Sequence, residues 1–208
     1  FSIELARIYG EQTKFEAMFK NYVDIIEKNY RYFNMLSPSF SDFLTEDPEN
    51  PANKAFKQVL LSRNQTDPKL IYNKMLSWLF TQEGNLAFAF VQEKAIYARS
   101  EVKQLDGIFE LGEIAFAQEQ YVLAETIFNH VQATTNQQLL FYRSAQYLLQ
   151  LLQHNSDFDD QEINQAYTDF FEVEEVTPLT HPIYSDWVQF TANQLQQVPQ
   201  AINLLDRL

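Results

Sequence analysis

Six alanines recur along the chain at nearly even spacing. The intervals between them are 38, 34, 35, 42 and 35 residues. A period of this length is typical of stacked arrays, in which each unit is a helix pair or a similar small element that cannot bury its apolar face alone. The spacing therefore predicts an array of helix pairs, with the alanines in the second helix of each pair: Ala17, Ala55, Ala89, Ala124, Ala166 and Ala201.

The clearest unit spans residues 105–136 and reads LDGIFELGEIAFAQEQYVLAETIFNHVQATTN. Its first helix carries Leu111-Gly112, and its second helix carries Ala124, Phe128 and Val131. Residues four and seven positions apart lie on one face of a helix, so these three side chains point the same way. The small Ala124 lets the second helix approach the first, while the larger residues fill the space beside it.

This pattern resembles the tetratricopeptide repeat, whose unit is about 34 residues long. The resemblance covers the whole chain, but the repeats are degenerate in residues 1–69 and clearer in residues 70–208. It implies an all-α fold, an α-α superhelix built as a right-handed solenoid of antiparallel helix pairs, in one domain over residues 1–208. Two short stretches, FVQEKAIYAR at Phe90–Arg99 and LGEIAF at Leu111–Phe116, also resemble uncharacterised multi-repeat proteins of Bacteroidetes.

Turn residues fall between the predicted helices. Gly84-Asn85 predicts a tight turn, and the long interval of 42 residues predicts an extended turn at residues 154–161, ended by Asp159 or Asp160 as the helix N-cap. Three prolines at residues 37–51 leave room for at most one short helix. Because apolar sequence reaches both ends, we expect the array to belong to a longer protein.

The net charge is −13, from 28 acidic and 15 basic residues. Nucleic acids and anionic lipid surfaces both attract Lys and Arg, so neither is an expected partner. No apolar run reaches the roughly 18 residues of a membrane span, which predicts no membrane insertion. The chain has no cysteine, which excludes disulfides and thiolate chemistry and fits the bacterial cell envelope or periplasm as well as the cytoplasm.

Motifs that carry chemistry are missing. His130, His154 and His181 are far apart in sequence, and we interpret them as surface or helix-end residues. Asn155, Asp157 and Asp159 alternate like a calcium loop, but the glycine and glutamate that such a loop requires are replaced by Asp160 and Ala166. Phosphate loops and nucleophile elbows are absent as well. The sequence thus predicts no catalytic residue, no cofactor and no metal site.

A tetratricopeptide array binds protein or peptide partners on the concave groove lined by its first helices, so the resemblance implies a set of groove residues. Aromatic side chains in such a groove would suit recognition of a peptide or a helix. Each aromatic residue could instead pack against the next helix pair. The implied partner-binding residues are Lys74, Trp78, Thr81, Phe109, Glu113, Phe116, Tyr142, Gln146 and Phe190, with Asp186 and Asn193 on the same inner face of the last unit.

Several functions fit this sequence. The first is a non-catalytic scaffold for protein–protein interaction, which requires an open groove. The second is a regulatory or sensor module, for which a pocket with convergent polar groups is expected. The third is a structural spacer within a longer solenoid. An α-helical enzyme would need a pocket that holds perturbed ionisable groups.

Overall fold

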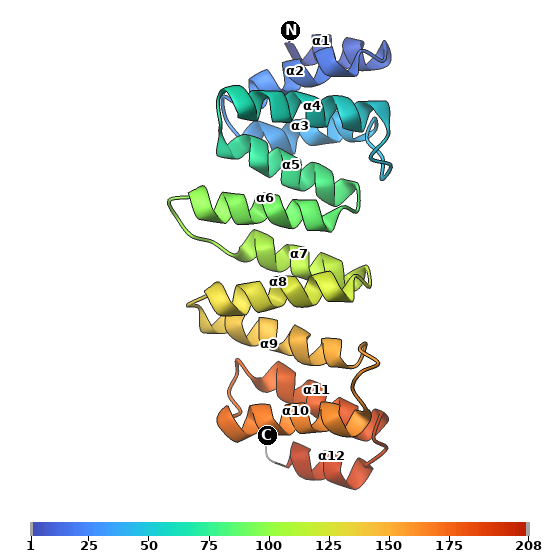
Figure 1. Ribbon diagram of the computed structural model, residues 1–208, viewed down its shortest axis with the longest axis vertical. Helices are drawn as coiled ribbons and strands as arrows, with labels where there is room; N and C mark the ends of the chain where they lie inside the picture. The colour runs from blue at the N-terminus through green and yellow to red at the C-terminus, as the bar shows by residue number, and fades with distance from the viewer. Residues whose placement is uncertain (1, 207–208) are drawn as a thin grey trace. The chain divides into compact units, whose positions relative to one another are not determined.

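The computed structural model describes residues 2–206 and folds them into twelve α-helices, with no strand among these residues (Figure 1). The prediction of an all-α fold is therefore confirmed. In chain order the helices are α1 (Ser2–Glu11), α2 (Phe15–Ile26), α3 (Arg31–Ser41), α4 (Pro51–Thr66), α5 (Leu70–Gln82), α6 (Leu86–Arg99), α7 (Asp106–Ala117), α8 (Tyr121–Thr134), α9 (Gln138–Leu152), α10 (Asp160–Val173), α11 (His181–Asn193) and α12 (Val198–Leu205).

The chain divides into two compact units, an N-terminal unit of Phe1–Gln104 with α1–α6 and a C-terminal unit of Leu105–Leu208 with α7–α12. Within each unit successive helices run back and forth, so that each odd-numbered helix is followed by an antiparallel even-numbered one (Figure 1). In the described part of the chain, no helix has both the length and the apolarity needed to cross a bilayer. The single domain and the right-handed superhelix over residues 1–208 stay predictions.

The six alanines fall on α2, α4, α6, α8, α10 and α12, so each lies on an even-numbered helix, where the second helices were predicted. Three of them, Ala89, Ala124 and Ala201, are buried. The other three are half-buried, and the residue that follows each of them is completely or almost completely buried: Met18, Phe56 and Tyr167. The spacing thus located the second helices, whereas the most buried position is shifted by one residue in α2, α4 and α10.

Gly112 explains how closely α7 approaches α8. A Cβ atom at this position would lie 2.8 Å from Cε1 of Phe128 and 3.0 Å from Cγ2 of Ile127. Both neighbours are fully buried, so they have no free space to move into. The small residue that this helix pair requires is therefore in the first helix as well as at Ala124 in the second.

The predicted turns lie where the sequence placed them. Gly84 sits between α5 and α6 with φ of 66°, a left-handed conformation that glycine adopts without strain. Asp159 is the N-cap of α10, and its carboxylate accepts hydrogen bonds from the backbone N–H groups of Gln161 and Glu162. The Glu162 carboxylate in turn accepts from the N–H of Asp159, which completes a capping box.

The proline-rich segment holds the C-terminal half of one helix and a loop. Pro38 lies inside α3, which continues only to Ser41, and Pro51 opens α4 behind the N-cap Asn50. The loop is fastened by Asn53, whose side chain bonds both the N–H and the carbonyl of Thr45. The same Asn53 amide donates to the buried Glu83 carboxylate at 3.1 Å, which ties the start of α4 to the end of α5.

The C-terminal unit packs its last two helix pairs around aromatic side chains. Tyr167 of α10 stacks parallel to Trp187 of α11, and the hydroxyl of Tyr184 donates to the carbonyl of Leu204 in α12. The Trp187 indole N–H donates to the Asn164 side chain at 2.8 Å. These contacts hold α10, α11 and α12 together. Asp186, on another side of α11, contacts α9.

Candidate functional site

A cavity of about 300 Å³ lies in the C-terminal unit, where the C-terminal ends of the three first helices α7, α9 and α11 come together. First helices run in the same direction because a second helix reverses the chain between them. Five of the lining side chains are primary amides, and only one is a carboxylate. The lining residues are Phe116, Gln150, Gln153, His154, Asp186, Gln189, Phe190, Asn193 and Gln194.

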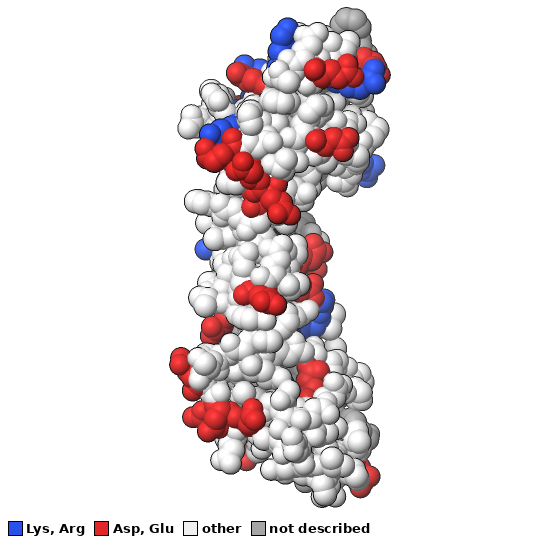
Figure 2. All heavy atoms as spheres, turned by 90° about the vertical axis from the view of Figure 1, so that its right-hand side faces the viewer, with Lys and Arg blue, Asp and Glu red and all other residues white. Residues whose placement is uncertain are grey.

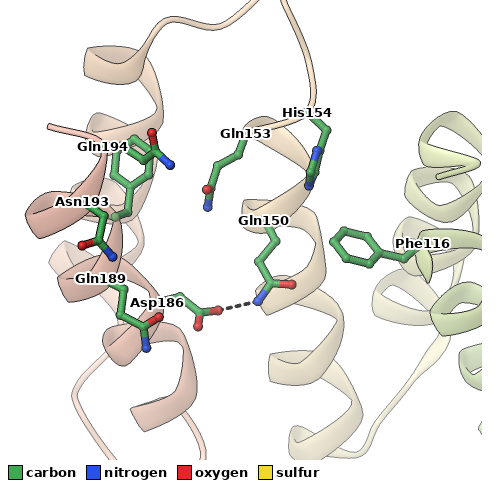
Figure 3. A pocket seen from close by; sticks show the side chains of 9 residues that line it. Phe116, Gln150, Gln153, His154, Asp186, Gln189, Asn193 and Gln194 are labelled. Atoms are coloured by element: carbon green, nitrogen blue, oxygen red, sulfur yellow. Dashed lines mark hydrogen bonds between the residues drawn. The ribbon is translucent and has the colours of Figure 1, made fainter. Parts of the chain in front are cut away.

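The carboxylate of Asp186 is held by two amides from the neighbouring helix. Gln146 Nε2 and Gln150 Nε2 donate to Asp186 Oδ2 at 2.8 and 2.7 Å. Figure 3 shows the Gln150 amide pointing from α9 toward Asp186 on α11. Within residues 2–206, no hydrogen bond is formed by the second oxygen, Oδ1 of Asp186. The site therefore presents a fixed carboxylate whose partners in the described part of the chain are neutral.

The negative charge of Asp186 affects the pKa of Tyr167, a buried residue of α10. Burial raises the pKa of the Tyr167 phenol, and the negative charge of Asp186 raises it further. A hydrogen bond from Gln153 lowers this pKa to a smaller extent. The half-buried Asp186 carboxylate thus lies close enough to the buried phenol for its charge to act on it.

Aromatic rings form the opposite wall. Phe116 in the last turn of α7 meets Tyr147 of α9 and the imidazole of His154 edge to face, with centroid distances of 5.2 and 5.8 Å. The His154 ring stacks on Tyr121 at 4.3 Å. In Figure 3 Phe116 lies beyond Gln150, on the side of α9 away from Asp186. The cavity is thus aromatic toward α7, whereas on the side of α11 it is lined by Phe190 and by polar side chains.

The helix ends add a negative field to the cavity. Phe116, Gln150 and Asn193 all lie in the last turns of their helices, which end at Ala117, Leu152 and Asn193. The C-terminus of a helix carries a partial negative charge that stabilises nearby cations by about 0.3–1 kcal/mol per helix. Three such ends around one cavity favour a positively charged group inside it.

The net charge of the chain is confined to one unit. Residues 105–208 hold 15 acidic residues against 2 basic ones and therefore carry the whole formal charge of −13, whereas residues 1–104 hold 13 of each kind. On the face shown in Figure 2, blue and red side chains mix over the N-terminal unit and red predominates over the C-terminal unit. The Arg143 guanidinium of the C-terminal unit is engaged with Glu113 at 2.7 Å.

A second hollow of about 470 Å³ adjoins the first and shares four lining residues with it: Gln153, His154, Phe190 and Gln194. It continues around the end of α9 to Ser156 and Phe158 of the turn and Ile163 of α10. The two hollows are therefore contiguous, and together they are called the depression below. A ligand that fills both must extend around the end of α9.

The predicted groove residues of the C-terminal unit separate into two groups. Phe116 and Phe190 line the cavity, and Gln146 holds its carboxylate. Phe109 is instead 2% exposed, beneath the Arg143 guanidinium and the Tyr147 ring.

Two further predicted residues bond to neighbouring helices. Glu113 accepts hydrogen bonds from Arg143 and Tyr147, and the Tyr142 hydroxyl donates to Glu174 Oε2 at 2.7 Å. Tyr142 thus lies on the side of α9 that faces the end of α10.

The three predicted groove residues of the N-terminal unit each contact neighbouring groups of the protein itself. Half-buried Trp78 packs edge to face against three rings, those of Phe33, Phe40 and Phe56. The exposed Lys74 ammonium lies over the Tyr30 ring, 5.0 Å from its centroid. The Thr81 hydroxyl donates to the carbonyl of Ser77, one turn earlier in the same helix. The protein's own side chains thus fill the space around Trp78.

Four of the five amides that line the cavity were not predicted from the sequence: Gln150, Gln153, Gln189 and Gln194. Gln146, Gln150 and Gln153 are spaced four and three residues apart, and Gln189 and Asn193 are four apart, so each set lies on one helix face. Amides at helical spacing on two successive first helices were the signal that could have located the cavity. The alternating Asn155, Asp157 and Asp159 form a polar turn and a helix cap, as interpreted.

Comparison with models of protein families finds no match for this chain, and comparison with curated proteins finds none either. The functional assignment therefore depends on the helix pairs and on the geometry of the cavity.

Proposed function

We propose that this chain is a non-catalytic binding module of the tetratricopeptide type, which holds an extended segment of a partner protein on the first-helix face of its C-terminal unit. This face is made by α7, α9 and α11, and the proposal includes the right-handed superhelical course of the array. The single observation that carries the proposal is the amide-lined depression at the ends of these three helices.

The chemistry of the lining suits a polypeptide. A primary amide has two N–H donors and an acceptor oxygen, so it can bond both the N–H and the C=O groups of an extended backbone. Gln189 and Asn193 on α11 and Gln194 at its C-cap are exposed and face Gln150 and Gln153 across the depression (Figure 3). Phe116 offers an aromatic surface beside them for an apolar or flat side chain.

The same lining supports a binding role over a catalytic one. Amides transfer protons poorly, whereas general acid–base catalysis needs groups whose pKa lies near the working pH. Two ionisable side chains, Asp186 and His154, line the cavity. A binding module requires only that these groups be positioned.

A sensor of a small ligand is the second candidate, because the polar groups of α9 and α11 converge on one cavity. The depression extends past the cavity to Phe158 and Ile163, which favours the longer ligand. No specific observation in the C-terminal unit favours a structural spacer.

Selection from a phage-displayed library of random linear peptides on the immobilised full chain tests the proposal. The double variant Gln189→Ala/Asn193→Ala removes two exposed amides. We expect it to bind the selected peptides with about tenfold lower affinity. Gln161→Ala/Gln165→Ala, an exposed amide pair on α10, is the matched control and should bind as the parent does. If no peptide is enriched, or if the two double variants behave alike, the proposal is wrong.

A further inference from the structure

The structure points to the chemistry of the partner segment, and this inference rests on the proposed function. We infer that the cavity takes the cationic side chain of a lysine or arginine in the bound peptide, with Asp186 as its counter-ion. The C-terminal unit would then select basic segments from among otherwise similar peptides.

The first support is the state of the Asp186 carboxylate. Its two partners, Gln146 and Gln150, are neutral donors, and both bind the same oxygen. A guanidinium or ammonium adds the attraction between opposite charges to such hydrogen bonds, and a guanidinium can bond both carboxylate oxygens, so either cation would gain more from this carboxylate than the neutral amides do. The amides meanwhile fix its position in advance, which reduces the entropy lost on binding.

The second support is that no cation of the described protein occupies the cavity. None of the nine lining residues is Lys or Arg. Arg143 on α9 is held by Glu113 and lies over the Phe109 ring, 4.3 Å from its centroid. An incoming basic side chain therefore meets no lysine or arginine among the lining residues.

The third support is the field around the cavity. Three helix C-termini face it, and the surrounding unit carries the whole net charge of −13. Such a field raises the association rate of a basic peptide and repels an acidic one. The aromatic wall at Phe116 adds a surface on which a guanidinium can stack.

A labelled peptide of alternating arginine and alanine, capped at both ends, is the probe for this inference. Its matched control replaces each arginine by citrulline, which keeps the planar shape, replaces one nitrogen donor group by a carbonyl oxygen and removes the charge. Fluorescence anisotropy with the full chain should show at least about tenfold weaker binding of the citrulline peptide. The affinity for the arginine peptide should fall as salt is raised.

Two variants separate the cavity from the general acidity of the unit. Asp186→Asn is expected to lower the affinity for the arginine peptide about tenfold, because it removes the charge of a partly buried counter-ion. Asp169→Asn removes the same charge from an exposed position on α10 and should change the affinity less than about twofold. Circular dichroism of both variants shows whether each is folded. The citrulline comparison uses the unaltered chain and tests the inference even if a variant unfolds.

The possible outcomes are distinct. If both variants weaken binding equally, the peptide is attracted to the acidic surface and the cavity is not its site. If citrulline and arginine peptides bind alike at the amides of α11, the proposed function stands and the choice of a cation is wrong. If spermidine binds as tightly as the arginine peptide, the cavity recognises a free polyamine and the inference is overturned.

Discussion

The rings of Phe128 and Tyr147 lie parallel, with 4.5 Å between their centroids and 4° between their planes. Phe128 belongs to the second helix of one pair and Tyr147 to the first helix of the next. The Tyr147 ring also meets Phe109 and Phe116 edge to face. In an array whose pairs cannot bury their apolar faces alone, stability depends on such contacts between neighbouring pairs. Through Phe109 and Phe116, Tyr147 also connects α9 to α7, and Phe116 lines the cavity.

Removing the contact between Phe128 and Tyr147 should destabilise the C-terminal unit. Tyr147→Ala is expected to lower the free energy of unfolding of the C-terminal unit by about 2–4 kcal/mol, from lost burial and lost ring contacts. Urea unfolding followed by circular dichroism measures the change. Val122→Ala on α8, where the side chain is 81% exposed, is the control and should stay within about 0.5 kcal/mol. Equal effects of the two changes would argue against the stack as a joint between the pairs.

Gly112 should resist even the smallest substitution. Gly112→Ala brings a methyl group to 2.8 Å from the Phe128 ring, so we expect a loss of about 1–3 kcal/mol despite the higher helix propensity of alanine. Thermal unfolding compared with the parent provides the measurement. A variant as stable as the parent would mean that α7 moves away from α8 without cost.

The start of α10 depends on its cap. Asp159→Ala removes the side chain that accepts from Gln161 and Glu162, which should cost about 1 kcal/mol. Asp157→Ala lies two residues earlier in the same turn and makes no cap contact, so it serves as the control for the loss of one negative charge. Chemical denaturation of the two variants side by side decides the matter: the capping account fails if Asp157→Ala is the more destabilising.

Alkaline pH should weaken the C-terminal unit through Tyr167. Burial and then the charge of Asp186 hold the pKa of this phenol above its ordinary value of 10.0. The unfolded chain therefore releases this proton at lower pH than the folded chain does, and stability falls as the pH rises above about 10. In Tyr167→Phe the decline between pH 9 and 11.5 should be shallower. An unchanged slope in urea unfolding across this range would contradict the assignment.

The architecture was predictable because its signals are local or periodic. The alanine spacing placed six second helices, and Gly84 and Asp159 marked turns whose conformations depend on those residues themselves, on the missing Cβ of Gly84 and on the carboxylate of Asp159. The site was less predictable. The inner-face positions that follow from the repeat include Phe116 and Phe190, which line the cavity, and also Phe109, which is buried.

The difference between these positions depends on residues of other helices, which a repeat pattern does not contain. Phe109 is covered because Arg143 and Tyr147 of α9 lie over it, and Trp78 is enclosed by rings from α3 and α4. The amides of the cavity are polar residues on helix faces, a placement that solvent alone would also explain. Only their convergence from α9 and α11 distinguishes them.

The most direct test of the central claim is nuclear magnetic resonance of the ¹⁵N-labelled full chain during titration with the arginine–alanine peptide. Side-chain amide signals of Gln and Asn report on the cavity itself. We predict the largest saturable shifts at the side-chain amides of Gln146, Gln150, Gln189 and Asn193, with small shifts at Gln161 and Gln165. Shifts centred on α10 or on the N-terminal unit, or none at saturating peptide, would contradict a peptide site at the ends of α7, α9 and α11.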